Sequence, residues 1–351
     1  MFSYTLFLPF LLVLLLTPLV GKFAEKIGAL DVPDSRKVHF HPKPLLGGLA
    51  IYAGFLAAVL LFQPVHPAHW PILAGSGIIL AVGIWDDLFN LTPSAKLLGQ
   101  ILAACPAVFF ADLQVQYVNL PNGGILEFGL FSIPVTFLWI IIITNAMNLL
   151  DGLDGLSAGV SGIALAAIAG MASMMGDKYV FFMAVALTGS LLGFIPYNFY
   201  PAKIFMGDTG ALFLGYIISV LSLLGFKNIT FFSFLVPFLI LGVPISDTVL
   251  VIIRRLLHKQ PITRADRSHF HHWLLDAGFS HRQTVLILYF ISTLLALSAF
   301  IFTKAALWGT AGILVLGLLL AEFLFEAGWA GKKYKPIFRL FGVKPERKRE
   351  P

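Results

Sequence analysis

The chain has 351 residues, of which 58% are hydrophobic and only 12% are charged, with a formal net charge of +6. Soluble domains carry about 25% charged residues, so the composition excludes an ordinary soluble protein. The positive charge alone is compatible with nucleic acid, but the hydrophobicity favours a membrane protein that binds no nucleic acid. The single cysteine, Cys105, excludes a disulfide framework.

Apolar segments follow one another along the chain, each near the ~20 residues that a helix needs to cross a bilayer. We predict eleven spans, at 2–20, 47–62, 70–85, 97–111, 133–150, 157–175, 179–195, 211–226, 230–253, 284–303 and 306–325. No basic residue precedes the first segment and no cleavage site follows it, which favours a retained span over a signal peptide. The predicted fold class is an all-α polytopic membrane protein, with residues 1–330 as a single catalytic domain and 331–351 as a basic tail.

Between the fourth and fifth spans, the stretch VQYVNLPNGGILEFGLF has two β-leaning runs around Asn122-Gly123. An Asn-Gly pair between such runs is a hairpin signal. We therefore predict a small external β-hairpin at this junction.

Lysine and arginine are distributed unevenly between the two ends of the spans. If the N-terminus is outside, the outer junctions hold only Lys178, Lys227 and Lys304, and the remaining 21 of 24 lie on the other side. This asymmetry follows the positive-inside rule and places the C-terminal tail in the cytosol. The tail itself is interpreted as a topology signal, with an anchor for anionic lipid as the alternative.

The polar motifs of the chain all fall on this inner side. They are DVPDSRKVHFHPKPLLGG, WDDLFN, NAMNLLDGLDG, PYNFYPAKIFMGDTG and RRLLHKQPITRADRSHFHHWLLDAGFSHRQ. The outer loops carry only single acidic residues. Any chemistry is therefore expected at the cytosolic surface of the membrane.

Asp86 and Asp87 are adjacent at the end of the third predicted span. At a helix end both side chains can turn toward one cavity, where two like charges require a cation or a shared proton. A solvated helix end is the alternative. Lys96 follows nine residues later, either as an interfacial anchor or as a group that neutralises phosphate.

Asn145, Asn148 and Asp151 recur at every third position, and Gly152 then loosens the helix so that Asp151 and Asp154 can project from its end. Such groups are costly near hydrocarbon unless they bind something. Oxygen ligands of this kind suit Mg²⁺, which bridges to substrate phosphates. Hydrogen bonds between helices are the alternative, and they account better for the asparagines than for the aspartates.

The junction between the seventh and eighth spans carries a second mixed cluster. Asn198, Lys203, Phe205 and Asp208 lie in a predicted loop whose glycines permit close approach of the backbone. Lys203 can supply a positive charge for phosphate, and Asp208 can supply a magnesium ligand. Phe205 offers an aromatic face on which a base can stack. Ordinary interfacial packing is the alternative for Phe205.

Two basic clusters complete the inner surface. The first is formed by Arg36, Lys37 and Lys43 together with two histidines, and the second by His269, His271 and His272 among several arginines. The histidine spacing matches neither of the common zinc patterns, so we interpret this loop as an anion-binding clamp. For both clusters the alternative is the positive-inside bias of the chain alone. Asp247, within the ninth span, is expected to make a structural bond to a neighbouring helix.

Five stretches of the chain, taken together, closely resemble the polyprenyl-phosphate N-acetylhexosamine-1-phosphate transferases of glycosyltransferase family 4. They are RKVHFHPKPLLGG, WDD…SAK, NAMNLLDGLDGLSAG, NFYPAKIFMGDTGALFLG and ADRSHFHHWLLDAGFSHRQ. The resemblance covers nearly the whole chain. It implies a membrane enzyme that transfers N-acetylglucosamine-1-phosphate from UDP-GlcNAc to undecaprenyl phosphate, releasing UMP. It also implies Mg²⁺, with Mn²⁺ as the alternative, and a homodimer as a further expectation.

The sugar is inferred from one loop. The sister branch that transfers phospho-N-acetylmuramoyl-pentapeptide carries Pro-Ile-His-His-His, whereas this chain has Ser268-His269-Phe270-His271-His272. This resembles the branch that uses UDP-GlcNAc and starts O-antigen, enterobacterial common antigen or wall teichoic acid. Another UDP-N-acetylhexosamine or UDP-MurNAc-pentapeptide is the alternative donor. The family's lysine after the paired aspartates is Asn90 here, with Lys96 as the substitute.

The resemblance also implies roles for individual residues. Asp208 would be the main magnesium ligand beside Asp86 and Asp87, and Asp87 is preferred as the group that deprotonates or orients the lipid phosphate. The nucleotide would be held by Asn148, Asp151, Asp154 and Asn198, with Phe205 stacking on uracil. The histidines and the cluster from Arg36 to Lys43 would neutralise the diphosphate, and a lipid groove would lie beside the ninth span.

Two other classes of protein fit the motifs less well. A transporter would place its site near the bilayer midplane on broken helices, often with internal repeats, whereas these motifs lie at the cytosolic ends. A CDP-alcohol phosphotransferase has an Asp-Gly-x-x-Ala-Arg core, and DGLDGLSAGVSGIALAA lacks that arginine.

Overall fold

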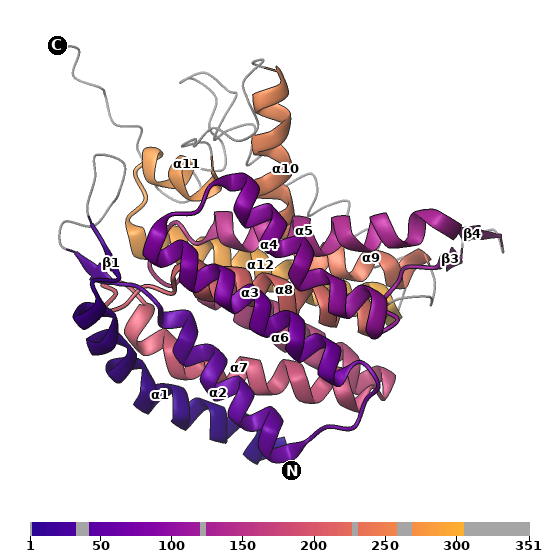
Figure 1. The fold of residues 1–351 in the computed structure, drawn as a ribbon. Helices are drawn as coiled ribbons and strands as arrows, with labels where there is room; N and C mark the ends of the chain where they lie inside the picture. Colours follow the sequence, from indigo (N-terminus) through magenta and orange to yellow (C-terminus); the bar gives the residue numbers. More distant parts are fainter. Residues whose placement is uncertain (1, 33–41, 120–123, 227–230, 258–268, 305–351) are drawn as a thin grey trace.

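This computed structural model describes residues 2–32, 42–119, 124–226, 231–257 and 269–304 (Figure 1). Helices dominate, and their bounds are α1 (Phe2–Ile27), α2 (Gly47–Phe62), α3 (His69–Phe89), α4 (Pro93–Cys105), α5 (Ser132–Leu150), α6 (Leu156–Met175), α7 (Lys178–Asn198), α8 (Gly207–Phe226), α9 (Phe231–Ile240), α10 (Gly242–Leu257), α11 (Phe270–Asp276) and α12 (His281–Lys304). A single π-helical turn, Pro106–Phe110, continues α4.

The chain is an all-α polytopic membrane protein, as the sequence predicts. Among the described residues, eight helices are long and apolar enough to cross a membrane, and α2 is a shorter apolar helix. The predicted span at 306–325 and the basic tail lie outside the described residues. The number of eleven spans therefore stays a prediction.

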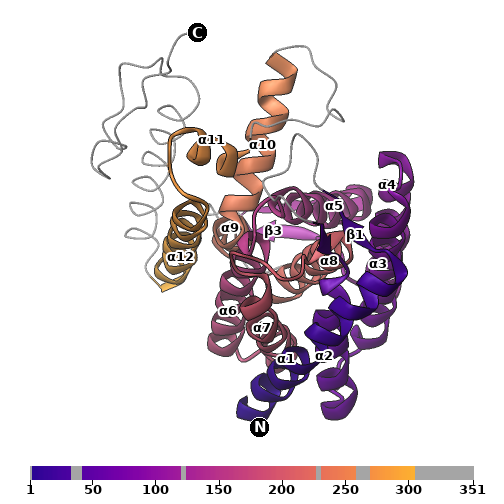
Figure 2. The same ribbon diagram turned by 90° about the vertical axis from the view of Figure 1, so that its left-hand side faces the viewer.

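Helix α8 lies at the centre of the bundle, surrounded by its neighbours when the bundle is seen along its length (Figure 2). It is apolar on all sides, which is typical of a helix that is buried all round, and Tyr216 in its middle is completely buried. Glycines let other helices approach its first turn. A Cβ atom on Gly83 of α3 would lie 2.5 Å from Cα of Thr209, and one on Gly48 of α2 would collide with the backbone of Gly210. These contacts fix where α8 begins.

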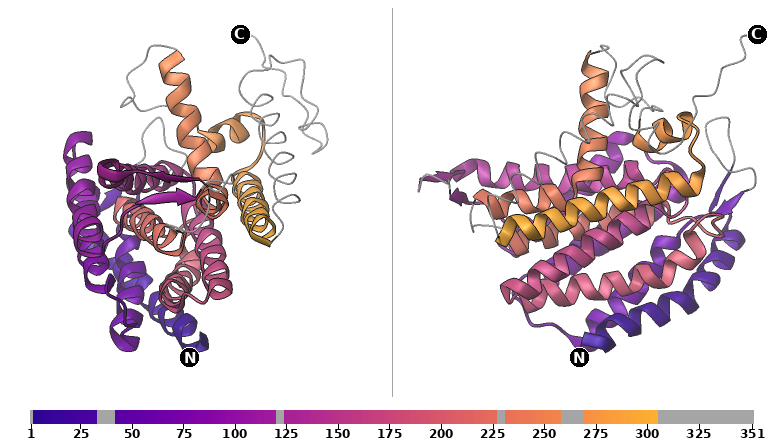
Figure 3. Two further views of the ribbon diagram at one scale, coloured as in Figure 1. Left: turned by 90° about the vertical axis from the view of Figure 1, so that its right-hand side faces the viewer. Right: turned by 180° about the vertical axis from the view of Figure 1, so that it is seen from behind.

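The predicted span at 230–253 is wrong as one continuous helix. The chain breaks at Leu241: α9 follows the bundle, whereas α10 leaves it crosswise (Figure 3). Pro244 explains the break, because proline has no N–H and its ring would clash with the carbonyl of Ile240 in a continuous helix. In the first turn of a new helix the same residue is tolerated.

Two small antiparallel ladders join the helices. Strands β3 (Tyr117–Asn119) and β4 (Ile125–Glu127) pair with Val118 opposite Leu126, which confirms the predicted hairpin. Strands β1 (Leu30–Asp31) and β2 (Lys43–Pro44) form a second ladder with Asp31 opposite Lys43. This second ladder was not predicted, and it closes the loop between α1 and α2 at the polar end of the bundle.

The contact between α3 and α8 yields a stability prediction. Gly83→Ala should lower the free energy of unfolding by about 1–3 kcal/mol, because the new methyl group overpacks against backbone atoms that cannot move aside. Thermal unfolding in detergent measures the change. The matched control is Gly162→Ala in α6, where a Cβ meets no atom within 4 Å. If Gly83→Ala and Gly162→Ala both keep the melting temperature of the parent protein, the α3–α8 contact is not closely packed and the prediction is wrong.

Candidate active site

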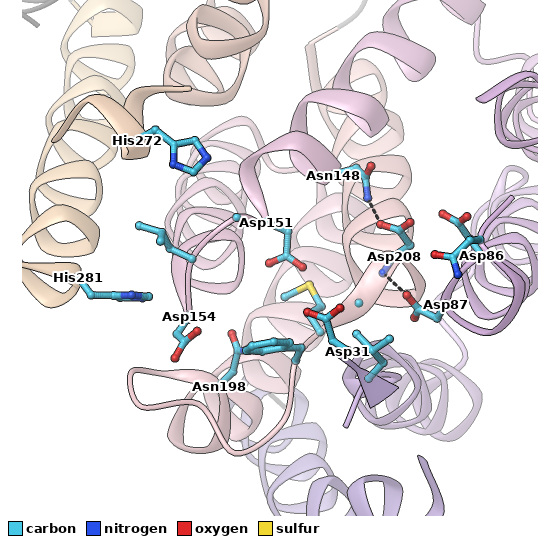
Figure 4. Close-up of a pocket in the computed structure, with 17 residues that line it drawn as sticks. Asp31, Asp86, Asp87, Asn148, Asp151, Asp154, Asn198, Asp208, His272 and His281 are labelled. Atoms are coloured by element: carbon cyan, nitrogen blue, oxygen red, sulfur yellow. Dashed lines mark hydrogen bonds between the residues drawn. The ribbon is translucent and has the colours of Figure 1, made fainter. Parts of the chain in front are cut away.

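A cavity of about 410 Å³ opens at the end of the bundle where several helices begin or end (Figure 4). Its lining residues are Asp31, Leu45, Asp86, Asp87, Asn90, Asn148, Asp151, Gly152, Leu153, Asp154, Asn198, Phe205, Met206, Gly207, Asp208, His272 and His281. They come from β1 and the segment before α2, from the ends of α3, α5 and α7, from the α5–α6 and α7–α8 loops, and from the starts of α8, α11 and α12. The inner-side motifs of the sequence therefore converge on one space.

The carboxylate of Asp87 holds the first turn of α8. Its Oδ1 accepts a hydrogen bond from the backbone N–H of Asp208 at 2.8 Å, and its Oδ2 accepts from the N–H and the hydroxyl of Thr209 at 3.1 and 2.6 Å. The first N–H groups of a helix have no partner within it, so an acceptor from another helix satisfies them. Gly207 has a φ of 71°, and a side chain there would collide with Asp87.

Asp208 lies in the first turn of a helix, not in the loop that the sequence predicts, and two neighbours bind its side chain. Asn148 of α5 donates to Oδ1, and the ammonium of Lys96 of α4 contacts Oδ2 at 2.7 Å. Lys96 also makes an ion pair with Asp86, whose Oδ1 accepts the N–H of Leu91 at 2.7 Å. The lysine therefore bridges two acidic groups from different helices.

Lys96, which was predicted to contact substrate, does not itself line the cavity and contacts two of the carboxylates that do. Asn90 lines the cavity at the end of α3, where it brings no charge, and the chain turns there with a φ of 52°. Thr92 then caps α4 by accepting the N–H of Ala95 at 3.3 Å. This cap starts α4 beside α3, so that the lysine one turn later faces the carboxylates.

The cavity is strongly anionic. Six carboxylates line it: Asp31, Asp86, Asp87, Asp151, Asp154 and Asp208. Figure 4 shows Asp86, Asp87 and Asp208 toward one end and Asp154 and His281 toward the other, with Asp151 between them. Burial, reinforced by the charges of Asp208, Asp87 and Asp154, raises the pKa of Asp151 to about 8. A carboxyl group here resists ionisation unless positive charge is supplied.

The segment before α2 clamps the loop that carries Phe205. The backbone N–H of Phe205 donates to the carbonyl of Pro44 at 2.9 Å, and its carbonyl accepts the N–H of Gly47 at 3.0 Å. Lys43 donates to the carbonyl of Ala202 at 2.6 Å. Lys43 was predicted to contact substrate, but it does not line the cavity and supports the loop instead.

Two further side chains face the cavity from the α7 side. Asp154 accepts the N–H of Ala202 at 2.8 Å with one carboxylate oxygen. Asn198 is 3% exposed, and its amide nitrogen donates to the carbonyl of Ile204 at 3.0 Å. Its Oδ1 is buried with no hydrogen-bond partner. An acceptor of this kind is costly to bury, and it is available to a donor on a ligand.

Several predicted substrate residues lie elsewhere. Asn145 does not line the cavity, and its side chain pairs with Gln100. Lys203 is exposed and also lies outside the lining. Arg36 and Lys37 are outside the described residues.

The predicted histidine clamp divides into three different environments. His269 is buried and its Nδ1 lies 2.7 Å from Asp247 Oδ2, so Asp247 makes the structural contact that the sequence predicts. His271 is also buried, and burial, followed by the neighbouring histidines, holds its pKa well below the usual value. A neutral imidazole cannot attract phosphate as a cation. Only His272 of the three lines the cavity.

Sequence reasoning missed three polar residues of the lining. Asp31 and His281 were inside quoted motifs but were not singled out, and Asn90 was noted only as a departure from the family. The ring of His281 stacks on Tyr200 at 4.4 Å between centroids. No periodicity marks these residues, because Asp31 lies in a two-residue strand, Asn90 follows the end of α3, and His281 begins α12.

The fold and the cavity define a multi-pass membrane protein with a polar site at one end of its bundle. Residues 69–226 match the model of glycosyl transferase family 4. A probable undecaprenyl-phosphate N-acetylglucosaminyl 1-phosphate transferase of Bacillus subtilis is 44% identical over 94% of this chain and 93% of its own. A decaprenyl-phosphate N-acetylglucosaminephosphotransferase of Mycolicibacterium smegmatis is 35% identical, covering 80% and 77%. An undecaprenyl-phosphate alpha-N-acetylglucosaminyl 1-phosphate transferase of Escherichia coli K12 is 27% identical, covering 87% and 84%.

The chain therefore belongs to glycosyl transferase family 4, and this confirms the resemblance found in its motifs. As a member of a transferase family it is an enzyme, which excludes the transporter alternative.

The raised pKa of Asp151 gives a prediction about pH. The folded carboxyl stays protonated up to about pH 8, whereas the unfolded one ionises near pH 4. Between these two pH values the folded protein holds a proton that the unfolded chain releases. The contribution of Asp151 to the free energy of unfolding therefore falls as pH rises. Asp151→Asn should therefore raise the melting temperature in metal-free detergent, with a gain that grows from pH 5 to pH 8. A difference that is the same at every pH would contradict the raised pKa.

Proposed function

We propose that this enzyme transfers N-acetylglucosamine-1-phosphate from UDP-GlcNAc to undecaprenyl phosphate, giving undecaprenyl-diphosphate-GlcNAc and UMP. The names of the relatives and the motifs of the inner side support this substrate pair. The observation that carries the proposal is electrostatic. Six carboxylates line a cavity that lies at the end of a membrane bundle, where a water-borne nucleotide and a lipid phosphate can meet. Both substrates are anionic, so the site requires cations.

The donor set fits Mg²⁺. All the candidate ligands are hard oxygen donors, which magnesium prefers. Within the part of the chain that the structure describes, no three acidic or histidine side chains converge as a ready-made metal cage. That is the arrangement expected for Mg²⁺, which is usually held by one or two carboxylates together with waters and substrate phosphates. Lys96 already places one positive charge between Asp86 and Asp208.

Asp208 and Asp86 would hold the metal, and Asp87 would fix the helix that carries Asp208. When bound, Mg²⁺ would neutralise the diphosphate of the donor and make its β-phosphorus more electrophilic. Mn²⁺ has the same charge and accepts the same ligands. The residues thus supply position and charge balance, which are the main requirements of phosphoryl transfer.

The nucleotide is assigned to the side of the cavity formed by the α7–α8 loop. Phe205 is clamped through its backbone and lines the cavity, which suits stacking of its ring on uracil. The free Oδ1 of Asn198 is an acceptor for a base N–H or a ribose hydroxyl. Asp151 and Asp154 would contact the ribose and sugar hydroxyls, and His272 the diphosphate.

In the reaction, an oxygen of the lipid phosphate attacks the β-phosphorus. The bond from that phosphorus to the oxygen shared with the α-phosphate breaks, and UMP leaves. The sequence favours Asp87 of the Asp86–Asp87 pair as the group that orients or deprotonates the attacking phosphate. Both oxygens of Asp87 accept hydrogen bonds from α8. The oxygens of Asp86 are engaged too, because Oδ1 accepts the N–H of Leu91 and Oδ2 has an ion pair with Lys96. We assign the role to the pair.

We place the enzyme in the bacterial cytoplasmic membrane, with the N-terminus outside and the site and the C-terminus in the cytosol, because the basic residues gather on that side. The product suits the first membrane step of an envelope polysaccharide such as O-antigen or teichoic acid. Purified protein given a polyprenyl phosphate and a panel of UDP-sugars tests the donor. UMP release with UDP-GlcNAc is expected, and release only with UDP-MurNAc-pentapeptide would overturn the assignment.

Asp208→Asn should lower UMP release at least about 100-fold at saturating Mg²⁺, since it removes a preorganised charge from the reacting centre. The protein should keep its melting temperature within a few degrees, because asparagine can still accept from Asn148. Asp112→Asn is the matched control, because Asp112 is exposed and lies outside the cavity lining. Near-normal turnover in Asp208→Asn would remove this carboxylate from the metal site.

Phe205→Ala should raise the KM for UDP-GlcNAc about 10-fold or more, since base stacking contributes about 1–3 kcal/mol. The kcat should fall less than the KM rises, because stacking stabilises the ground state and the transition state alike. Phe205→Tyr keeps an aromatic face and is the control. A change confined to the KM for the lipid substrate would contradict the assignment.

A further inference from the structure

Helices α4 and α5 are joined by a reciprocal pair of amide side chains. Asn145 Nδ2 donates to Gln100 Oε1 at 2.6 Å, and Gln100 Nε2 donates to Asn145 Oδ1 at 3.2 Å. Gln100 is only 2% exposed. Asn145 also donates to the carbonyl of Ile141 at 2.8 Å, which fixes the orientation of its amide. Neither residue lines the cavity.

The pair lies one helical turn from the groups that bind Asp208. Lys96 precedes Gln100 by four residues, and Asn148 follows Asn145 by three, so each couple shares one face of its helix. A turn rises about 5.4 Å. Lys96 and Asn148 are the residues that contact the two oxygens of Asp208. The alignment of α4 with α5 therefore decides whether both contacts form together.

Apolar packing alone defines this alignment poorly. Helix α4 is peripheral, and Leu97, Leu98 and Leu102 on it are between 44% and 57% exposed. Its close contact with α3, where Gly99 packs against Val82, does not involve α5. Two amides that exchange hydrogen bonds satisfy each other in one register only, and a slip leaves buried polar groups without partners.

We propose that Gln100 and Asn145 are positioning residues, which hold α4 and α5 in the register that places Lys96 and Asn148 on Asp208. The proposal rests on the proposed function and adds to it two residues that touch neither substrate. It also gives Asn145 a role different from the ligand contact predicted from sequence. Small displacements of catalytic groups are costly, because an error of about 1 Å can reduce the rate about 100-fold.

The test compares Gln100→Leu, Asn145→Leu and the double variant. Each single variant leaves one amide of the pair without its partner in the other helix, so both should lose stability and kcat. The double variant has no orphaned amide and packs apolar surface, so its melting temperature should recover. Its kcat should stay at least about 10-fold below that of the parent, with the KM for UDP-GlcNAc changed less than about threefold. A merely structural pair would recover kcat together with stability, and that result would overturn the proposal.

A matched control and a second readout separate this proposal from the proposed function. Ser222→Ala removes another buried contact of α5, the 3.1 Å hydrogen bond from Trp139 to Ser222 on α8, and should leave kcat within about twofold. Thermal stabilisation by Mg²⁺ alone, without substrates, should weaken in the double Leu variant but persist in Ser222→Ala. Equal stabilisation of both variants would contradict the positioning role. A parent protein that releases no UMP from any UDP-sugar would refute the proposed function. The Mg²⁺ titration would still test whether Gln100 and Asn145 set the register of α4 against α5.

Discussion

Six acidic side chains share one cavity, and those that are ionised repel one another and any phosphate that approaches. At the end of a membrane bundle this repulsion is weakly screened, because helices and lipid replace water on most sides. The raised pKa of Asp151 is a direct consequence of that environment. The site is therefore unfavourable by itself, and in the proposed function cations that enter with the substrate make it favourable. Lys96 supplies one positive charge, and the proposed divalent metal supplies the rest.

The rest of the structure keeps these charges in place. Three helices hold Asp208 of α8 in place. Asp87 of α3 accepts hydrogen bonds from the backbone of the first turn of α8, and Lys96 of α4 and Asn148 of α5 contact the Asp208 side chain. Glycines in α2 and α3 bring those helices against the same turn. Because α8 is buried along most of its length, the position of Asp208 is fixed by the core of the bundle. A loop could not hold a carboxylate among like charges with the same accuracy.

Much of this site follows from the sequence alone. Acidic residues that come directly after a long apolar run have no partner in lipid, so this pattern by itself assigns Asp151 and Asp154 to a site. The same argument found Asp86, whereas Asp208 was found from its cluster with Asn198 and Lys203 between two spans. It failed for Asn145, because an amide near a helix end can serve a ligand or another helix equally well, and only the position of Gln100 decides between them.

Other features depend on tertiary contacts that the order of residues does not reveal. The break at Leu241 had a signal in Pro244, but an apolar run with a proline is compatible with a kinked span as well as with two helices. His271 has the sequence context of a cation in a basic loop, yet burial keeps it neutral. Asp31 enters the site through a two-residue strand that is too short to predict from its composition.

The central claim is that a divalent cation is needed to bring the nucleotide into a cavity lined by carboxylates. The most direct measurement is the affinity of the purified protein for UDP-GlcNAc, without lipid acceptor, in Mg²⁺ and in a chelator. The account predicts binding at least about tenfold tighter in Mg²⁺, which corresponds to about 1.4 kcal/mol. Equal affinity in the two conditions would show that the carboxylates tolerate the diphosphate without a metal, and would contradict the account.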